Sequence, residues 1–197
     1  LQDINVNEYV YNEETTKDNN KVVETNRSII STTTSMKVNI KNIGDKANTY
    51  TIGGIVGSGI NTIIGGNRNS KLVSSNALPI KVTYNSDTVN ESSLSNIIVG
   101  GVVGQLTNNS DSSGLFKVYN IGAINIDNNK KSNKYIGGIV GRAMGGKYEA
   151  IYNVGEIQLK ESDPSSYNIG GIMGTSETNS SQNSLILTKF INFADIN

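Results

Sequence analysis

The stretch "IGGIVGRAMGGKYEAIYNVGEI", residues 136–157, contains two short phrases that recur along the chain. The first is a glycine pair followed by two aliphatic residues and a third glycine. Successive pairs begin 47, 37 and 33 residues apart, a spacing typical of solenoid repeats, so we expect a stack of similar units rather than a closed globule. The glycines of the four copies are Gly53, Gly54 and Gly57; Gly100, Gly101 and Gly104; Gly137, Gly138 and Gly141; and Gly170, Gly171 and Gly174.

The second phrase, Tyr-Asn-x-Gly-x-Ile, alternates with the first. It occurs in 118–126 and 151–159, with a weaker copy in 190–196, and the segments 40–46 and 72–80 fit the same template. One aligned position contains Asn42, Ser74, Asn120, Asn153 and Asn192, and the position two residues later contains Gly44, Asn76, Gly122, Gly155 and Ala194. We expect the first position to form an asparagine ladder between stacked coils. We expect left-handed backbone at the second, because asparagine replaces glycine best in that conformation.

Short runs rich in Ile and Val, bounded by Gly, Asn and Ser, are typical of strands. The predicted fold is therefore all-β: a right-handed, parallel β-helix-like solenoid of about four to five coils, with about three short strands per coil. A β-sandwich is the structural alternative. Residues 36–197 would form the solenoid, and residues 1–35, which lack both phrases, an N-terminal arm, a cap or the end of a preceding domain. Gly145-Gly146 predicts a local tight turn.

Composition excludes several kinds of chemistry. The 17 basic residues balance 17 acidic ones, which leaves no electrostatic signature of nucleic-acid binding, and no apolar stretch is long enough to cross a membrane. The chain has no Cys and no His, so thiolate and imidazole metal ligands and a Ser-His-Asp triad are excluded. We expect no cofactor and a monomer. The chain begins at Leu1, and we interpret it as an excised fragment or a processed chain.

The paired phrases resemble the GLUG motif family. The best copies are Ile136-Gly137-Gly138-Ile139-Val140-Gly141 and Tyr152-Asn153-Val154-Gly155-Glu156-Ile157, and the resemblance covers about residues 36–197. It implies a region of a large secreted or cell-wall-attached bacterial protein: an adhesin-like protein, or the non-catalytic part of an IgA-cleaving zinc metallopeptidase. The family motif is structural, so the resemblance supplies no catalytic residues. The zinc-binding His-Glu-x-x-His of those peptidases is not in this chain.

Three groups of residues are candidates for chemistry or binding. Glu156 and Asp195 would stack on adjacent coils about 5 Å apart, the separation of a retaining glycosidase pair, and one of them would then have a raised pKa. Asn108, Asp111 and Ser113 resemble alternating calcium ligands, but the bidentate acid that would complete such a loop is missing. Tyr119 and Tyr152 stack in register and could form an exposed aromatic strip that binds glycan or protein. We assign no catalytic and no metal residues, and a phosphate-binding loop is excluded because the Gly-Lys-Ser/Thr ending is missing.

The sequence therefore predicts a non-catalytic, extracellular module that acts as a stalk or as an adhesive surface for host protein or glycan, with a role in virulence. One alternative is a substrate-holding or spacer region of a secreted metalloprotease. A weaker alternative is a carbohydrate-active β-helix enzyme.

Overall fold

The computed structural model describes residues 6–7, 30–31, 36–42, 48–65, 73–86, 94–128, 131–161, 166–178 and 184–197. Two short strands, β1 (Val6–Asn7) and β2 (Ile30–Ser31), pair antiparallel. The rest of the segment 1–35, for which an arm or cap is predicted, lies outside the described residues.

The remaining strands form four parallel sheets, numbered here in the order in which each coil visits them. Sheet 1 contains β4 (Thr49–Gly53), β9 (Asn96–Gly100), β13 (Asn133–Gly137) and β17 (Tyr167–Gly170). Sheet 2 contains β5 (Val56–Ile60), β10 (Val103–Thr107), β14 (Val140–Met144) and β18 (Met173–Glu177). Sheet 3 contains β6 (Ile63–Ile64), β7 (Ser74–Asn76), β11 (Gly114–Asn120), β15 (Gly146–Asn153) and β19 (Leu185–Asn192). Sheet 4 contains β3 (Met36–Asn42), β8 (Ile80–Ser86), β12 (Ile124–Asn128) and β16 (Ile157–Glu161).

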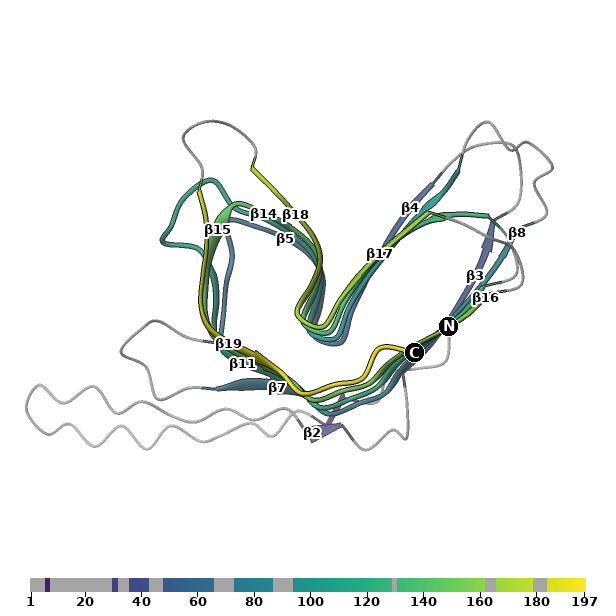
Figure 1. The fold of residues 1–197 in the computed structure, drawn as a ribbon, viewed down its shortest axis with the longest axis horizontal. Helices are drawn as coiled ribbons and strands as arrows, with labels where there is room; N and C mark the ends of the chain where they lie inside the picture. Colours follow the sequence, from purple (N-terminus) through teal and green to yellow (C-terminus); the bar gives the residue numbers. More distant parts are fainter. Residues whose placement is uncertain are drawn as a thin grey trace, which may run out of the picture.

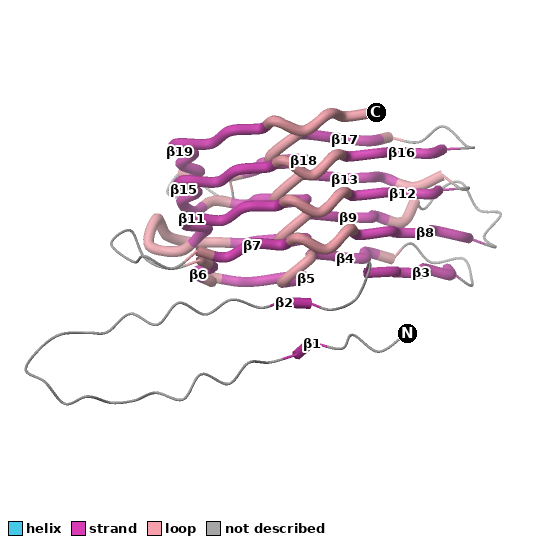
Figure 2. Tube along the Cα trace, turned by 90° about the horizontal axis from the view of Figure 1, so that it is seen from below, coloured by secondary structure: helices cyan, strands magenta, loops and turns pink. Residues whose placement is uncertain are grey.

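This arrangement confirms the predicted parallel β-helix, and the parallel stacking of equivalent strands rules out the β-sandwich. Figure 2 shows the coils stacked one above another, and Figure 1 looks along the stack, where the chain turns anticlockwise as it advances toward the viewer, so the winding is right-handed. Sheets 1 and 2 each contain four strands, one for each coil. The expectation of three strands per coil is wrong: each coil crosses four sheets, because it bends sharply inward at the glycine pair (Figure 1).

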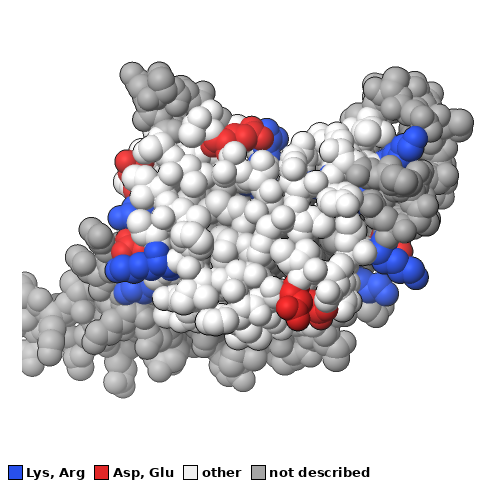
Figure 3. Space-filling view, in the orientation of Figure 1, with Lys and Arg blue, Asp and Glu red and all other residues white. Residues whose placement is uncertain are grey.

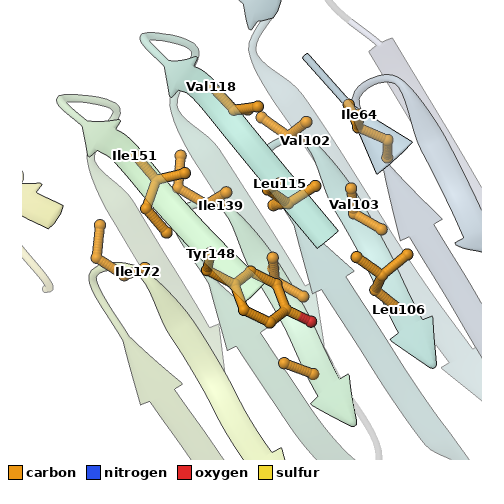
Figure 4. Packing of buried hydrophobic residues seen from close by; sticks show 12 residues of the cluster. Ile64, Val102, Val103, Leu106, Leu115, Val118, Ile139, Tyr148, Ile151 and Ile172 are labelled. Carbon is orange, nitrogen blue, oxygen red and sulfur yellow. The ribbon is translucent and has the colours of Figure 1, made fainter. Parts of the chain in front are cut away.

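The inward bend divides the cross-section into two lobes, each with its own apolar core. Lobe A lies between sheets 2 and 3, and lobe B lies between sheets 1 and 4; Figure 4 shows how the buried side chains of lobe A stack from coil to coil. The lobe A core contains Ile64, Val102, Val103, Leu106, Leu115, Val118, Ile139, Val140, Ala143, Tyr148, Ile151 and Ile172. The lobe B core contains Ile52, Ile80, Val82, Ile97, Val99, Ile124, Ile126, Ile136 and Ile157. Because each side chain packs against its equivalents above and below, burial depends on stacking.

Among the described residues, left-handed backbone occurs at the corner between sheets 2 and 3 and at a bend within sheet 3, and not at the position two residues after the ladder asparagine. Between sheets 2 and 3, Gly145 and Gly146 have φ angles of 64° and 92°, which confirms the predicted tight turn. Within sheet 3, the equivalent residues Lys117, Ala150 and Lys189 have φ angles of 56°, 57° and 54° and bend each strand. Left-handed backbone at residues with a Cβ is uncommon, so these positions were not identified from sequence.

Candidate binding surface

The two sequence phrases meet at the narrow waist between the lobes. An asparagine ladder runs through the waist along the stack, with each Nδ2 donating to the Oδ1 of the next coil: Asn76 to Asn120 over 3.0 Å, Asn120 to Asn153 over 3.0 Å, and Asn153 to Asn192 over 2.9 Å. The second Nδ2–H of each asparagine donates to the backbone oxygen two residues later, at Leu78, Gly122, Gly155 and Ala194. Asn120 and Asn153 are fully buried, so these bonds satisfy amides that water does not reach.

The predicted ladder contains two wrong members. Asn42 lies in β3, where it is opposite Ser86 in sheet 4, and not at the waist. Ser74 pairs with Val118, while Asn76 pairs with Asn120 and occupies the ladder position. The sequence alignment of the first coil was therefore wrong by two residues. It matched Asn76 to the glycine position of the later coils, whereas Asn76 is equivalent to Asn120.

The glycine pair faces the ladder across the waist. A Cβ on Gly101 would lie 2.5 Å from Nδ2 of Asn120 and would also overlap the carbonyl oxygen of Gly138 in the next coil. Gly54, Gly138 and Gly171 meet Asn76, Asn153 and Asn192 in the same way. The pair is thus required for close approach between opposite walls and not for phosphate binding.

The other glycines that recur in register also permit close approach, with Gly57 of the first coil as the exception. The third glycine of the first phrase lets sheet 2 approach sheet 1, since a Cβ on Gly141 would lie 2.8 Å from Cγ2 of Ile98. Gly122 and Gly155 do not have left-handed backbone, and neither does Asn76, so that expectation is wrong. A Cβ on Gly155 would instead overlap the carbonyl oxygen of Gly122. Gly44 lies outside the described residues.

An exposed apolar strip follows sheet 3 on the outside of the solenoid. Tyr119 and Tyr152 are in register, and their ring centroids lie 5.9 Å apart with planes tilted by 46°. Both side chains are half-buried, and Ile191 continues their column on β19 with 42% exposure. We define the apolar strip as these residues and a second column that lies two residues further along each coil: Tyr119, Tyr152, Ile191, Ile121, Val154 and Phe193.

The second column was missed in the sequence. Ile121, Val154 and Phe193 are 56%, 51% and 71% exposed. Each directly follows a ladder asparagine, and since neighbouring residues of an extended chain point to opposite sides, a residue after an inward amide points outward. Alternation counted from the ladder would have identified them. In the sequence they resemble core residues, because the aliphatic residues on either side of them in the chain point inward.

Charged residues lie on both margins of the apolar strip. Lys117 and Lys189 precede its Tyr119 and Ile191 by two residues, and the Lys189 ammonium lies 3.5 Å from Glu149, which also binds Lys147 over 3.1 Å. Glu156 and Asp195 lie on the other margin, each two residues after a strip residue. A polar rim around an apolar centre is the usual composition of a protein interaction surface.

The proposed carboxylate pair does not have the properties of a catalytic acid. Glu156 and Asp195 occupy equivalent positions in adjacent coils, as predicted, and Ile157 N donates to Asp195 O over 3.0 Å. However, hydrogen bonds from Gln158 Nε2 over 2.9 Å and from Asn197 Nδ2 over 2.7 Å lower the pKa of Glu156. The expectation of a raised pKa is therefore wrong for this carboxyl, since both neighbours stabilise its charged form.

The candidate calcium ligands do not converge. Asn108 is fully buried, and no hydrogen bond to its side-chain polar atoms is formed within the described part of the chain. Asp111 is exposed and accepts from Ser184 Oγ over 3.2 Å, while Ser113 Oγ donates to Ser110 O over 3.0 Å. No cluster of three acidic or metal-binding side chains occurs among the described residues.

One ion pair joins the last two coils on sheet 2. Arg142 binds Glu177 through two hydrogen bonds of 3.1 and 2.7 Å, and its guanidinium lies 5.9 Å from the ring centroid of Tyr135 on sheet 1. This contact connects the two walls of the inward bend and has the geometry of a structural pair.

No protein-family profile, curated protein or solved structure matches this chain. Within the described ranges, no helix has the length and apolar character of a membrane span.

Proposed function

We propose that the chain is a non-catalytic module of a larger secreted or surface-attached bacterial protein, and that the apolar strip binds host protein or glycan. The observation that carries the proposal is the strip itself. Three aliphatic or aromatic side chains that are more than half exposed, Ile121, Val154 and Phe193, lie beside stacked tyrosines on one face of the solenoid. Contiguous exposed apolar surface of this kind marks interaction sites in soluble proteins.

The scaffold supports a role in binding. The strip residues lie beside the waist, where fully hydrogen-bonded asparagines hold each coil in register with the next. A surface held rigidly in place loses little conformational entropy when it binds a partner, which favours affinity. Tyrosine rings can stack on sugar rings or contribute large contact areas to a protein partner, so both ligand classes remain within the proposal.

The test compares ligand binding by the natural chain and by a triple variant, Tyr119→Ser, Tyr152→Ser and Val154→Ser. Both proteins are applied to a glycan array and to a panel of immobilised extracellular host proteins. We expect at least one specific ligand for the natural chain and about a tenfold or greater loss of affinity for the variant, because buried aromatic contacts dominate interface energetics. Ile60→Ser is the matched control, since Ile60 is 70% exposed but lies on β5 of sheet 2, away from the strip.

Three results would contradict the proposal. Equal loss of binding in the control and the triple variant would move the site away from the strip. Hydrolysis of a glycan by the natural chain that Glu156→Gln abolishes would favour the carbohydrate-active alternative. Binding confined to the substrate of a secreted protease would instead favour the substrate-holding alternative.

A further inference from the structure

The C-terminal end of the solenoid leaves the lobe cores open. Phe190 occupies the same column of lobe A as Ile151, which is fully buried, yet Phe190 is 49% exposed. In lobe B, Tyr167 occupies the column of Ile97 and is 55% exposed, whereas Ile97 is fully buried. Ile196 forms a bridge with Ile157 and is 46% exposed. These side chains are inward-facing core residues that have a neighbouring coil on one side and solvent on the other.

The N-terminal end is closed in comparison. The first-coil members of the same columns are Ser74 in lobe A and Tyr50 in lobe B, and both are only partly exposed. The first ladder residue, Asn76, is 4% exposed. At the other end of the ladder, Asn192 is exposed. Among the described residues the two ends of the stack therefore differ. The C-terminal end leaves more of its core columns and the last ladder asparagine exposed, whereas at the N-terminal end Ile55 is 37% exposed.

The ladder has a direction, and its last member has a hydrogen to donate. Every earlier ladder asparagine uses both Nδ2 hydrogens, one within its coil and one toward the next coil. Asn192 donates within its coil to Ala194 O over 3.0 Å, and no described residue accepts its second hydrogen. In each earlier asparagine the equivalent hydrogen is donated to the next coil, so that of Asn192 points toward the position that a further coil would occupy.

The strands and charges of this end fit the same occupant. β17, β18 and β19 are the outermost strands of sheets 1, 2 and 3, so each has a backbone edge that can pair with one more parallel strand. Figure 3 looks onto this end in the orientation of Figure 1, and charged side chains lie at the periphery while the centre of the described surface is uncharged. A surface of this composition suits an apolar coil.

We propose that the C-terminal end is a docking surface for one further coil in the same register, supplied by polypeptide that follows Asn197, and that Asn192 donates to a side-chain oxygen of that coil. The inference rests on the proposed function to the extent that both make this chain part of a larger protein. It adds that the next part stacks directly on β17, β18 and β19, without a flexible linker. The N-terminal end of a second copy is disfavoured as the occupant because Ile52, Ile64 and Asn76 are already buried there.

The test extends the chain with a coil of known register. Since Ile196 bridges Ile157, a copy of residues 159–192 placed directly after Asn197 continues sheet 4 and ends with an asparagine above Asn192. Hydrogen–deuterium exchange then compares the extended chain with residues 1–197. We expect backbone amides of 185–192 to exchange at least about tenfold more slowly in the extended chain, and those of 114–120 to be unchanged.

Two controls separate the contributions. The same appended residues in scrambled order are expected to give no protection. The ordered copy with its terminal asparagine replaced by leucine is expected to give less protection than the ordered copy, because the hydrogen of Asn192 then has no acceptor. In the longer natural polypeptide, amides of 185–192 should exchange as slowly as in the extended chain.

Three outcomes would overturn the proposal: no protection from the ordered copy, rapid exchange of these amides in the longer natural polypeptide, or protection of residues 1–197 that rises with protein concentration and so identifies a second copy as the occupant. Ligand binding by the apolar strip is measured on the same samples. Since the strip is unchanged in every one of them, loss of ligand binding would count against the proposed function and not against the stacking.

Discussion

Gly101→Ala tests whether the glycine pair is required for close approach at the waist. The introduced Cβ would lie 2.5 Å from Nδ2 of Asn120, where non-bonded heavy atoms ordinarily lie about 3.5 Å apart, so the two walls must separate by about 1 Å. Backbone strain is not involved, because Gly101 does not have a positive φ angle. The expected damage is therefore to the contacts between the walls.

The magnitude follows from the hydrogen bonds of Asn120. Its amide takes part in three, with Asn76, Asn153 and Gly122, at 3.0, 3.0 and 2.8 Å. A buried hydrogen bond contributes about 1 kcal/mol, and a buried amide without a partner costs about 1–3 kcal/mol. Alanine recovers about 0.4–1 kcal/mol by restricting the unfolded chain. We expect a net loss of about 3–5 kcal/mol in the free energy of unfolding, which lowers Tm by about 6–20 °C in a chain of this size.

Gly57→Ala is the matched control. Gly57 also lies outside the left-handed region, and the nearest atom to its added Cβ is the carbonyl oxygen of Thr51 at 3.2 Å. This contact needs a shift of only a few tenths of an ångström, so the free energy of unfolding should change by no more than about 1 kcal/mol. Urea and thermal unfolding are followed by circular dichroism at 215–220 nm. Equal midpoints for the two variants would refute the role assigned to the waist.

Two further predictions concern ionisation. Asn153→Asp should destabilise the protein by about 3–5 kcal/mol at pH 7, because a buried carboxylate would face two acceptors, Gly155 O and Asn192 Oδ1. Burial raises the folded pKa of the introduced carboxyl above its unfolded value of about 3.9, so the deficit relative to the natural chain should be smallest below pH 4 and grow as pH rises; a deficit independent of pH in urea titrations would contradict this. For Glu156, a carbon-detected NMR titration should give a pKa below the ordinary value, and Gln158→Ala should move it back toward that value by removing a donor. An elevated pKa would restore Glu156 as a candidate acid.

Much of the stacking could be predicted from the sequence, because it depends on residues that recur at each coil. Gly100, Gly137 and Gly170 align in register in sheet 1, as the phrase predicts. The contact between the glycine pair and the ladder could not be predicted, since it requires the inward bend that makes two lobes out of one coil. Alignment of repeated phrases shows which residues are equivalent along the stack and carries no information about which walls meet across it.

Other features were hidden because their residues are chemically ordinary. Ala150 and Lys189 have left-handed backbone without being Gly or Asn, so the bend in sheet 3 has no local signature. Phe193 is exposed because it directly follows Asn192, whose side chain points inward, and neighbouring residues of an extended chain point to opposite sides. The sequence predicted the inward position of Asn192 but not the outward position of Phe193. Asn42 was misassigned because it matches the phrase in composition while lying in a different sheet.

The waist also explains how coils of different length can belong to one stack. Glycine pairs recur after 47, 37 and 33 residues, yet Gly53, Gly100, Gly137 and Gly170 still align. Each coil passes through the waist twice, once at a glycine pair and once at a ladder asparagine. A connection between these two points can be longer or shorter than its equivalent in the next coil, because the chain returns to the same position in the waist at its end. Insertions and deletions in the connections therefore alter the outline of a single coil and leave the alignment of all later coils intact, so that such a chain can diversify its loops one at a time.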